Sequence, residues 1–338
     1  MEPIGDSPVG SVRPTFERYR AFADAEADSS PRYRELALGV AGDAEVTALI
    51  DRLPAPRRQV NLVFASARFC GAPMEGYQAF RDWLVANWGA VEKIALAHTT
   101  QTNEAGRCAV LLPVMARIAA ERPGSPLALI EVGASAGLCL YPDRYSYRYR
   151  GAQGVRALDP VSGPSRVVLE CATSGPVPVP AAIPEVVWRA GVDLNPLDVN
   201  DADDIAWLDA LIWPEHDDRR ARLREAVRIV RADPPRIVAG DLNETLPSLA
   251  ASAPREATLI VFHTAVLAYL KRDDRARFRQ TISALGCHWL SNEGMRVTPG
   301  VGERLPRTAR PDPGDFIVAL DGRPVAFAQP HGRYLHWL

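Results

Sequence analysis

Apolar side chains in the first 125 residues recur at the three- and four-residue spacing of amphipathic helices. This spacing predicts helices over residues 11–25, 33–38, 76–88 and 103–120. Thr102 is the expected N-cap of the last helix, and Pro113 is expected to kink or divide it. A Pro-Gly-Ser-Pro sequence at residues 123–126 then ends the helical pattern. Residues 1–125 are therefore predicted to form a helical cap or lid.

From residue 126 onward, short apolar runs alternate with helical patterns. The apolar runs predict strands at 127–132, 186–193, 236–239, 258–263 and 288–291, and the helical patterns lie at 205–211, 219–231 and 275–285. Strands separated by helices indicate a parallel, doubly wound sheet of Rossmann type. The runs 316–320 and 324–328 flank Asp321-Gly322, which predicts a terminal antiparallel hairpin. Residues 142–185, rich in proline, glycine and valine, are expected to be an irregular or β-rich insertion in this 126–338 core.

Composition narrows the class of protein. The chain has 338 residues, a net charge of −2 and a hydrophobic fraction of 47%, which is typical of a soluble globular protein. The near-neutral charge argues against a surface that coats nucleic acid, so no nucleic-acid partner is expected. No apolar run approaches the roughly 20 residues that cross a bilayer, and residues 1–6 do not resemble a signal peptide. We therefore expect a cytoplasmic location and no membrane partner.

The cysteines predict no further chemistry. The five cysteines are scattered along the chain without a Cys-x-x-Cys pair, so neither a disulfide framework nor a zinc site is expected. No metal site is predicted from any other pattern.

The segment Glu131-Val132-Gly133-Ala134-Ser135-Ala136-Gly137 follows the first predicted strand and is compatible with two chemistries. As Glu-x-Gly-x-x-x-Gly, it is a turn whose backbone lets a ligand approach closely, with Glu131 able to accept hydrogen bonds from the ligand. As Gly-x-Ser-x-Gly, it is the nucleophile elbow of a serine hydrolase, with Ser135 as the nucleophile. A purely structural turn is the ordinary alternative to both.

The hydrolase interpretation also needs an acid and a histidine later in the chain. Asp241 with His263, or Asp315 with His331, would supply that order. Three features count against it: only helical sequence precedes the elbow, no His-Gly-Gly-Gly-like oxyanion segment is present, and a proline soon after the turn limits the next helix to about one turn. These features favour the first interpretation, a glycine turn of the kind that binds nucleotides.

Polar residues also stand at the tips of the later predicted strands. Asp193 is placed to accept both hydroxyls of a ribose, and Asp241 to accept an adenine amino group. Their structural alternatives are an Asx-turn and a helix cap. His263 ends the fourth strand and is a candidate general base or substrate partner, with a structural histidine as its alternative. Tyr269 follows it and could face the same crevice.

Residues 98–107, called the polar linker below, are unusually polar for a connection between two apolar helices. The linker contains His98, Asn103, Glu104 and Arg107. Asn103 and Arg107 are four residues apart and would share one helical face. An ion pair between Glu104 and Arg107 is the structural alternative. We expect the linker to contribute polar groups to the crevice.

Glu131-x-Gly133-x-x-x-Gly137, Gly191-Val192-Asp193-x-x-Pro196 and Gly240-Asp241 together resemble the core of class I S-adenosylmethionine-dependent methyltransferases. The predicted terminal hairpin fits that fold. The resemblance implies that Glu131, Gly133 and Gly137 hold the methionine end of the cofactor, Asp193 its ribose and Asp241 its adenine. Ser135 lies in the same cofactor-binding turn, where a glycine is common. The short helix before Pro142 and the insertion of about forty residues also depart from the pattern.

The chain more closely resembles the bacterial family DUF2332, whose reaction is unassigned. The resemblance covers most of the chain and rests on residues 102–113, 131–138, 207–208, 213–215 and 261–270. It supports a common fold and implies no particular reaction.

The sequence thus predicts an α-helical cap followed by a class I methyltransferase-like α/β core. The leading hypothesis is an enzyme that uses S-adenosylmethionine to methylate a small molecule. His263 is the expected base, with Glu104 and Arg107 as further catalytic residues, and His98, Asn103 and Tyr269 bind the substrate. The alternatives are a serine hydrolase using Ser135, a lyase or cyclase that consumes S-adenosylmethionine, and a non-catalytic protein that binds such a ligand.

Overall fold

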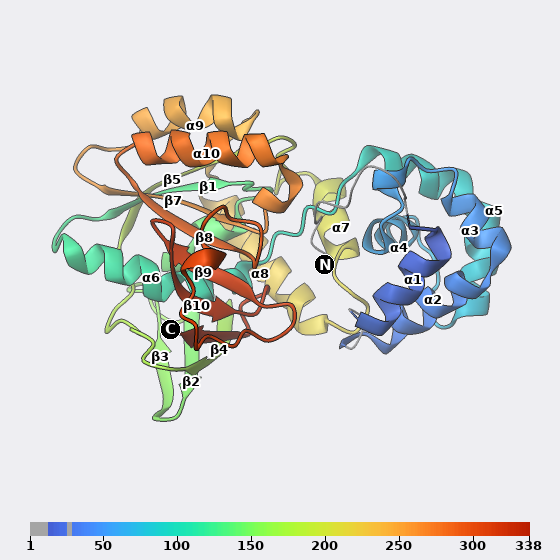
Figure 1. Cartoon of the computed structure of the whole chain (residues 1–338), viewed down its shortest axis with the longest axis horizontal. Coiled ribbons are helices and arrows are strands. Elements are labelled where there is room, and N and C mark those ends of the chain that lie inside the picture. The colour runs from blue at the N-terminus through green and yellow to red at the C-terminus, as the bar shows by residue number, and fades with distance from the viewer. Residues whose placement is uncertain (1–12, 26–28) are drawn as a thin grey trace. The chain divides into compact units, whose positions relative to one another are not determined.

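The computed structural model describes residues 13–25 and 29–338, which divide into two compact units. The helical unit contains the described residues up to Thr102 together with Asn200–Ala221. The sheet unit contains Asn103–Val199 and Arg222–Leu338. Figure 1 colours the chain by residue number, so the yellow helix α7 (Ala202–Ala210) can be followed into the otherwise blue helical unit.

The helices predicted in this unit are present with different bounds: the first begins later than predicted, the next two are longer, and two further helices were not predicted. Its other helices are α1 (Thr15–Ala25), α2 (Pro31–Gly42), α3 (Ala44–Ile50), α4 (Val60–Phe69) and α5 (Tyr77–Ala97). Residues 11 and 12 of the first predicted helix lie outside the described residues. Helix α2 begins earlier than predicted because Ser30 Oγ accepts from the Tyr33 N–H at 3.1 Å and Pro31 occupies the first turn.

An aromatic cluster forms the centre of the helical unit. Phe64 lies edge-on to Tyr19, Tyr33 and Phe80, with ring centroids 5.7, 5.0 and 5.5 Å apart. All four rings are buried. Each ring comes from a different helix, so this geometry joins α1, α2, α4 and α5.

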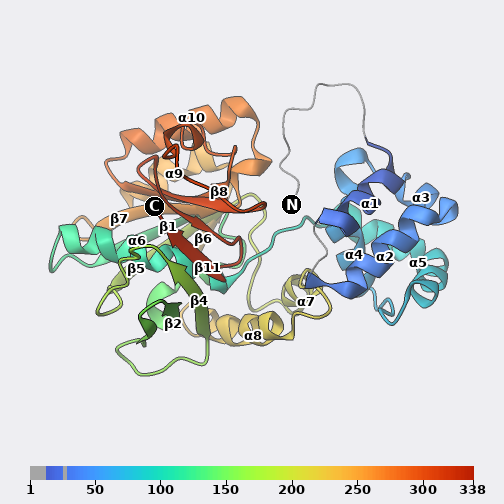
Figure 2. The ribbon, with the colours of Figure 1, turned by 60° about the horizontal axis from the view of Figure 1, so that its bottom comes forward.

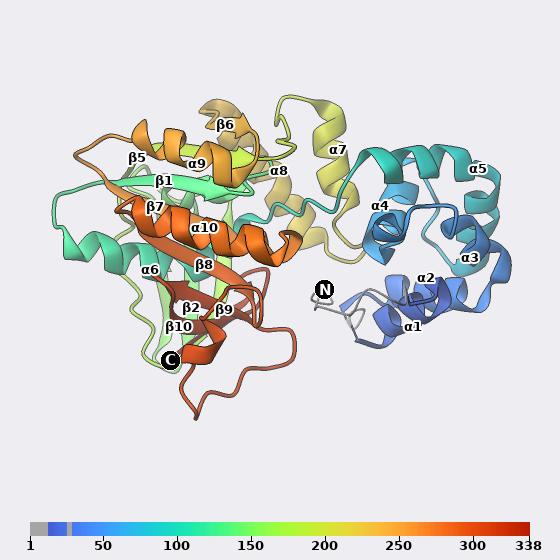
Figure 3. The ribbon, with the colours of Figure 1, turned by 45° about the horizontal axis from the view of Figure 1, so that its top comes forward.

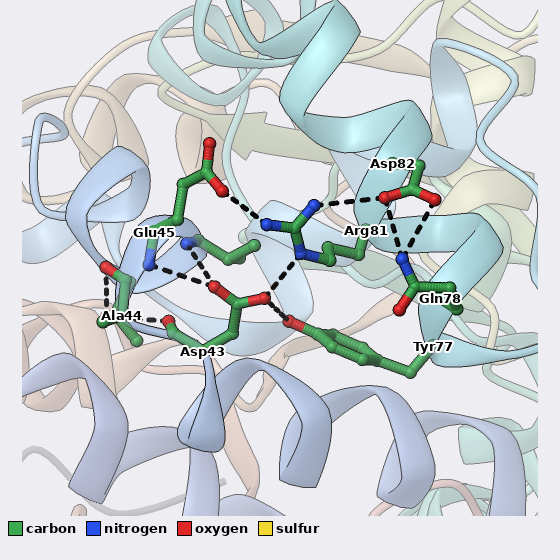
Figure 4. A network of polar contacts seen from close by, with 9 residues as sticks. Asp43, Ala44, Glu45, Tyr77, Gln78, Arg81 and Asp82 are labelled. Carbon is green, nitrogen blue, oxygen red and sulfur yellow. Dashed lines mark hydrogen bonds and ion pairs between the residues drawn. The ribbon is translucent and has the colours of Figure 1, made fainter.

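A polar network joins the start of α3 to α5 (Figure 4). Asp43 caps α3 by accepting the Val46 N–H at 3.0 Å, and its other oxygen accepts from Tyr77 Oη at 3.0 Å and Arg81 Nε at 2.8 Å. Arg81 also pairs with Glu45 and with Asp82. Partial burial acts to raise the pKa of Asp43, but the hydrogen bonds from Val46, Arg81 and Tyr77 together hold it below its usual value.

The sheet unit contains an eleven-stranded, mostly parallel sheet in the order β3-β2-β4-β11-β10-β9-β8-β7-β1-β5-β6. Its strands are β1 (Leu127–Val132), β2 (Ser146–Gly151), β3 (Gly154–Leu158), β4 (Val168–Ser174), β5 (Val186–Asp193), β6 (Arg236–Ala239), β7 (Thr258–Thr264), β8 (His288–Gly294), β9 (Phe316–Leu320), β10 (Arg323–Ala328) and β11 (Tyr334–Trp337). Strands β8, β7, β1, β5 and β6 are mutually parallel. Beyond them, β9 and β10 form the predicted hairpin, and β11, β4 and β2 continue the sheet (Figure 2).

Helices cover both faces of the parallel strands. They are α6 (Cys108–Glu121), α8 (Asp217–Ala232), α9 (Leu242–Ala251) and α10 (Arg272–Ala284). Helices α9 and α10 lie on one face of the sheet and α6 on the other (Figures 1 and 3). Ile130 and Val132 of β1 pack in the same buried cluster as Leu246 of α9 and Phe278 of α10. Side chains alternate along a strand, so Glu131 points to the α6 face.

The strand predictions are confirmed, and the helix before β1 is corrected. Thr102 does not cap a helix over 103–120. Instead Glu104 caps a 3₁₀ turn, Ala105–Arg107, and α6 begins at Cys108. Pro113 does not divide α6. It leaves the Ala109 carbonyl without its usual helical donor, and Tyr149 Oη of β2 donates to that carbonyl at 2.8 Å.

The predicted insertion is β-rich, since it contributes β2, β3 and β4 to the sheet. Strand β11 has no counterpart among the predicted elements.

Candidate functional site

The candidate site lies where the direction of the strand order reverses. Strands β5 and β6 lie on one side of β1, and β7 and β8 lie on the other. In open parallel sheets, ligands bind at the carboxyl ends of the strands beside such a switch point. The glycine turn leaves β1 at this place, so the structure positions the predicted turn where a ligand crevice is expected.

No α-helix follows the glycine turn. The chain instead forms two three-residue 3₁₀ turns, Leu138–Leu140 and Pro142–Arg144, before it enters β2. The prediction that Pro142 limits the helix after the glycine turn to about one turn is therefore confirmed. The polar linker holds the turn, because Asn103 Oδ1 accepts the Leu138 N–H at 2.8 Å.

Gly133 is covered by the protein's own chain. Its φ of 71° lies in the left-handed region, and a β-carbon added there would overlap Cγ2 of Val266. Val266 follows β7 directly after Ala265, itself a non-glycine residue with a φ of 58°. In this conformation, Val266 occupies the place from which a ligand would approach Gly133.

Ser135 also has a left-handed backbone, with a φ of 50°. Its side chain is buried, and Oγ has no hydrogen-bond partner. Among the described residues, no histidine therefore hydrogen-bonds to this hydroxyl, and the arrangement gives no support to a nucleophile–base pair at Ser135.

The two strand-tip aspartates make the local contacts expected of an Asx-turn and of a helix cap. Asp193 accepts the Ser135 N–H at 2.8 Å through Oδ2 and the Asn195 N–H at 2.9 Å through Oδ1. Asp241 caps α9 by accepting the Asn243 N–H at 2.8 Å. A carboxylate oxygen can accept more than one hydrogen bond, so their roles toward ribose and adenine stay predictions.

Two residues of the polar linker are buried beside the sheet. Arg107 donates through Nη1 to the backbone oxygen and to Oγ1 of Thr264, each at 3.1 Å, and through Nε to the Pro330 carbonyl at 3.1 Å. Glu104 Oε1 accepts the Gly106 N–H at 2.9 Å and pairs with Arg222 Nε at 2.8 Å. These contacts place Arg107 at the carboxyl end of β7 and join Glu104 to the linker and to Arg222 of α8.

Glu131 is 1% exposed, and its Oε2 has no hydrogen-bond partner. Burial raises its pKa well above the usual value, and the nearby Cys139 thiol acts in the same direction, whereas the charge of Arg107 opposes both. Burial thus shifts the balance toward the neutral carboxyl relative to an exposed glutamate. A neutral carboxyl can both donate and accept a hydrogen bond, and one oxygen is available for a ligand.

Asn292 of β8 was not among the predicted site residues. It is fully buried, and neither Nδ2 nor Oδ1 has a hydrogen-bond partner. It pairs in register with Thr264 of β7, the residue that Arg107 contacts. Thr264 lies two residues beyond Phe262, which pairs with Glu131, so all three polar side chains face the α6 side. In the sequence, the only sign of a role for Asn292 is that a polar residue ends an apolar strand.

His263 lies on the opposite face and is fully buried. Trp289 Nε1–H donates to its Nε2 at 2.9 Å, so the neutral ring carries its proton on Nδ1 and donates to Glu293 Oε1 at 2.7 Å. The same Glu293 oxygen accepts the N–H groups of Val266 and Leu267 at 2.8 and 3.1 Å. A structural role for His263 accounts for these contacts. The predicted role as a general base stays a prediction, and these contacts do not support it.

The two remaining predicted substrate residues lie elsewhere. His98 belongs to the helical unit, where its ring lies 4.5 Å from the Trp207 ring and 5.8 Å from that of Phe69. Tyr269 ends a 3₁₀ turn, Leu267–Tyr269, and is 54% exposed. The sheet unit thus contains Asn103, Glu104, Arg107 and Glu131, whereas His98 belongs to the helical unit and the Tyr269 side chain is exposed.

Comparison with known proteins identifies the family. A family model described as an uncharacterized protein conserved in bacteria (DUF2332) matches residues 69–337. The chain belongs to the DUF2332 family. The matched region of this DUF2332 protein contains every residue of the site described above. No curated protein and no solved structure matches the chain.

Two further features are absent from the described residues. None of the helices in residues 13–25 and 29–338 combines the length and apolarity needed to cross a membrane. The same residues contain no group of three or more His, Cys, Asp or Glu side chains placed to hold a metal ion.

Proposed function

We propose that this DUF2332 protein binds S-adenosylmethionine at the carboxyl ends of β1, β5 and β6 and transfers its methyl group to a small molecule. The observation that carries the proposal is Glu131, a buried carboxyl with an unpartnered oxygen at the switch point of a parallel sheet. An unsatisfied buried polar atom costs free energy, and a ligand amine or hydroxyl would satisfy it.

The residues fit the cofactor at its polar ends and need a rearrangement at Gly133. Glu131 would bind the amine of the methionine end, while Asp193 and Asp241 stand at the tips of the next two strands, β5 and β6. At Gly133, Val266 would have to move before a ligand could pack against the backbone. The left-handed Ala265 next to it stores backbone strain, which a change of conformation would release.

The protein's part in such a reaction is alignment. The bound cofactor supplies an activated methyl group on a sulfonium, which transfers by in-line displacement. Glu131 and Asp193 would orient the donor, and buried Arg107 holds the end of β7 against the polar linker. Glu131, Arg107 and Asn292 are buried, and such burial would limit the access of water to bound ligands.

Calorimetric titration with S-adenosylhomocysteine and S-adenosylmethionine tests the proposal. We expect binding by the wild-type protein and an affinity loss of about 10-fold or more in Asp193→Ala, since two hydroxyl hydrogen bonds to a carboxylate are removed. Asp201→Ala is a matched control, because the Asp201 carboxylate likewise accepts backbone N–H groups but lies in the helical unit. No binding at millimolar ligand would defeat the proposal, and unchanged affinity in Asp193→Ala would defeat the ribose assignment.

A non-catalytic ligand-binding protein is the second candidate, and His263 favours it. Both ring nitrogens of the predicted base are engaged within the protein, by Glu293 and Trp289. Methyl transfer to an acceptor that needs no base would still be possible. Binding of S-adenosylmethionine without formation of S-adenosylhomocysteine across a broad acceptor panel would decide for the second candidate.

A further inference from the structure

The amide of Asn292 is a buried group that the protein itself does not satisfy. Among the residues that the structure describes, it is the side chain for which two buried polar atoms both lack a hydrogen-bond partner. Burying an amide without partners is unfavourable, and an apolar side chain in the same place would avoid that cost. The buried Asn292 amide is therefore expected to hydrogen-bond to a partner that the folded chain does not provide.

Neighbouring polar groups show how different Asn292 is. His263, Glu293 and Trp289, which come from the same two strands, hydrogen-bond to one another on the other face of the sheet. Asn243, another buried asparagine, donates through Nδ2 to the Asp274 carbonyl at 3.2 Å. Each of these side chains therefore has at least one hydrogen-bond partner within the protein, whereas both amide atoms of Asn292 lack one.

Asn292 lies on the side of β1 away from the proposed ribose and adenine residues. Asp193 and Asp241 stand at the tips of β5 and β6, whereas Asn292 pairs with Thr264 of β7 and Val318 of β9. A ligand group at Asn292 would thus belong to the second substrate. It would lie beside Thr264, whose hydroxyl and carbonyl are held by Arg107.

We propose that Asn292 binds an amide group of the molecule that accepts the methyl group. An asparagine side chain offers one acceptor beside one donor, and a carboxamide presents the complementary pair. A carboxylate offers acceptors alone and would leave Oδ1 without a donor. That this molecule accepts the methyl group rests on the proposed function, whereas recognition of an amide by Asn292 does not.

The route to Asn292 involves the same segment that covers Gly133. The Ala265 N–H donates to the Asn292 carbonyl at 3.1 Å, and the next residue is Val266. Movement of Val266 away from Gly133 therefore disturbs the backbone contact at Asn292 as well. One rearrangement after β7 would therefore affect both halves of the proposed site.

A thermal-shift experiment with matched amide and acid probes tests the proposal. The probes are benzamide with benzoate, acetamide with acetate, and glutamine with glutamate, measured with and without S-adenosylhomocysteine. We expect at least one amide to raise the melting temperature of the wild-type protein more than its acid does, and Asn292→Leu and Asn292→Ala to abolish that difference. Without ligand, Asn292→Leu should melt about 2–4 °C above wild type because the unsatisfied amide is gone.

The outcomes separate this inference from the proposed function. Absence of S-adenosylhomocysteine binding by the wild-type protein defeats methyl transfer, and the amide comparison still reports on Asn292. Equal shifts for every amide and its acid, or amide shifts retained in both Asn292 variants, overturn the inference. Asn243→Leu is the control: it loses the bond to Asp274, so its melting temperature should fall while the amide shift remains.

Discussion

At the scale of single residues, the positions with the strongest electrostatic constraints serve either the fold or the site. Asp43 is the clearest example of the first kind, because its carboxylate accepts from a helix N-terminus, a tyrosine and an arginine. Glu131 is its counterpart at the site, because its carboxyl is buried with an oxygen left unpaired. Partners lower the pKa in the first case, and burial raises it in the second.

We predict that Asp43→Asn destabilises the protein at neutral pH by an amount that shrinks in acid. Asparagine keeps the cap but loses the charge that binds Tyr77 and Arg81, at a cost on the order of 1 kcal/mol for a partly exposed site. The native pKa of Asp43 is lowered, so its contribution is present above the usual Asp pKa of about 3.9 and is lost as the pH falls through the native value.

Urea unfolding of both proteins at neutral pH and near pH 3 measures this difference. Asp82→Asn is the control, because Asp82 also contacts Arg81 but is 60% exposed, and its effect should be smaller. A destabilisation by Asp43→Asn that is equal at both pH values would contradict the prediction.

At the scale of elements, the segment after β7 controls access to the glycine turn. Glu293 holds the N–H groups of Val266 and Leu267, and Val266 packs on Gly133. We predict that Val266→Ala binds S-adenosylhomocysteine more tightly than wild type, because less packing is lost when the segment moves. Each 1.4 kcal/mol of packing removed corresponds to about a tenfold gain in affinity.

Calorimetry on Val266→Ala and Val297→Ala tests the role of this segment. Val297 is packed in the same hydrophobic cluster, so its truncation should lower stability without raising affinity. Equal or weaker binding by Val266→Ala would show that Val266 does not oppose the ligand.

Local sequence signals predicted the parallel strands well because those strands are short apolar runs bounded by turn residues. Strands β1, β5 and β6 begin and end where the pattern placed them. The hairpin was likewise readable from Asp321-Gly322. Pro113 shows where such signals fail: its effect on α6 depends on Tyr149, a partner from a strand about 40 residues away that no local pattern contains.

The candidate site was predictable only in part, for the same reason. Glu131 and the glycine turn could be placed at a strand end from neighbouring residues alone. That His263 faces away from Glu131 follows from the alternation along β7, which becomes informative only once the pairing with β1 is known. The unpartnered state of Asn292 depends on the packing of the whole sheet unit, and no sequence pattern expresses it.

At the scale of the whole molecule, the helical unit is completed by residues from the middle of the chain. Asn200–Ala221, between β5 and β6 in sequence, belongs to it. Trp207 is fully buried there, packs against the His98 ring and donates through Nε1 to the Thr99 carbonyl at 3.1 Å. Arg68 also donates to the Ala210 carbonyl at 2.9 Å. A continuous N-terminal fragment therefore lacks part of its own core.

We predict that a fragment of residues 1–102 is much less stable than the same fragment joined by a flexible linker to residues 200–221. The addition restores the Trp207 packing, whose loss alone costs about 3–5 kcal/mol when a buried tryptophan is truncated. Circular dichroism during thermal unfolding should show a cooperative transition for the joined fragment and a weak or absent one for residues 1–102. Joined fragments carrying Trp207→Ala should behave like the short fragment, whereas Trp83→Ala, at a partly buried position of α5, should retain the transition. Equal cooperativity in both fragments would show that the first 102 residues form a complete folding unit and that Asn200–Ala221 merely packs against it.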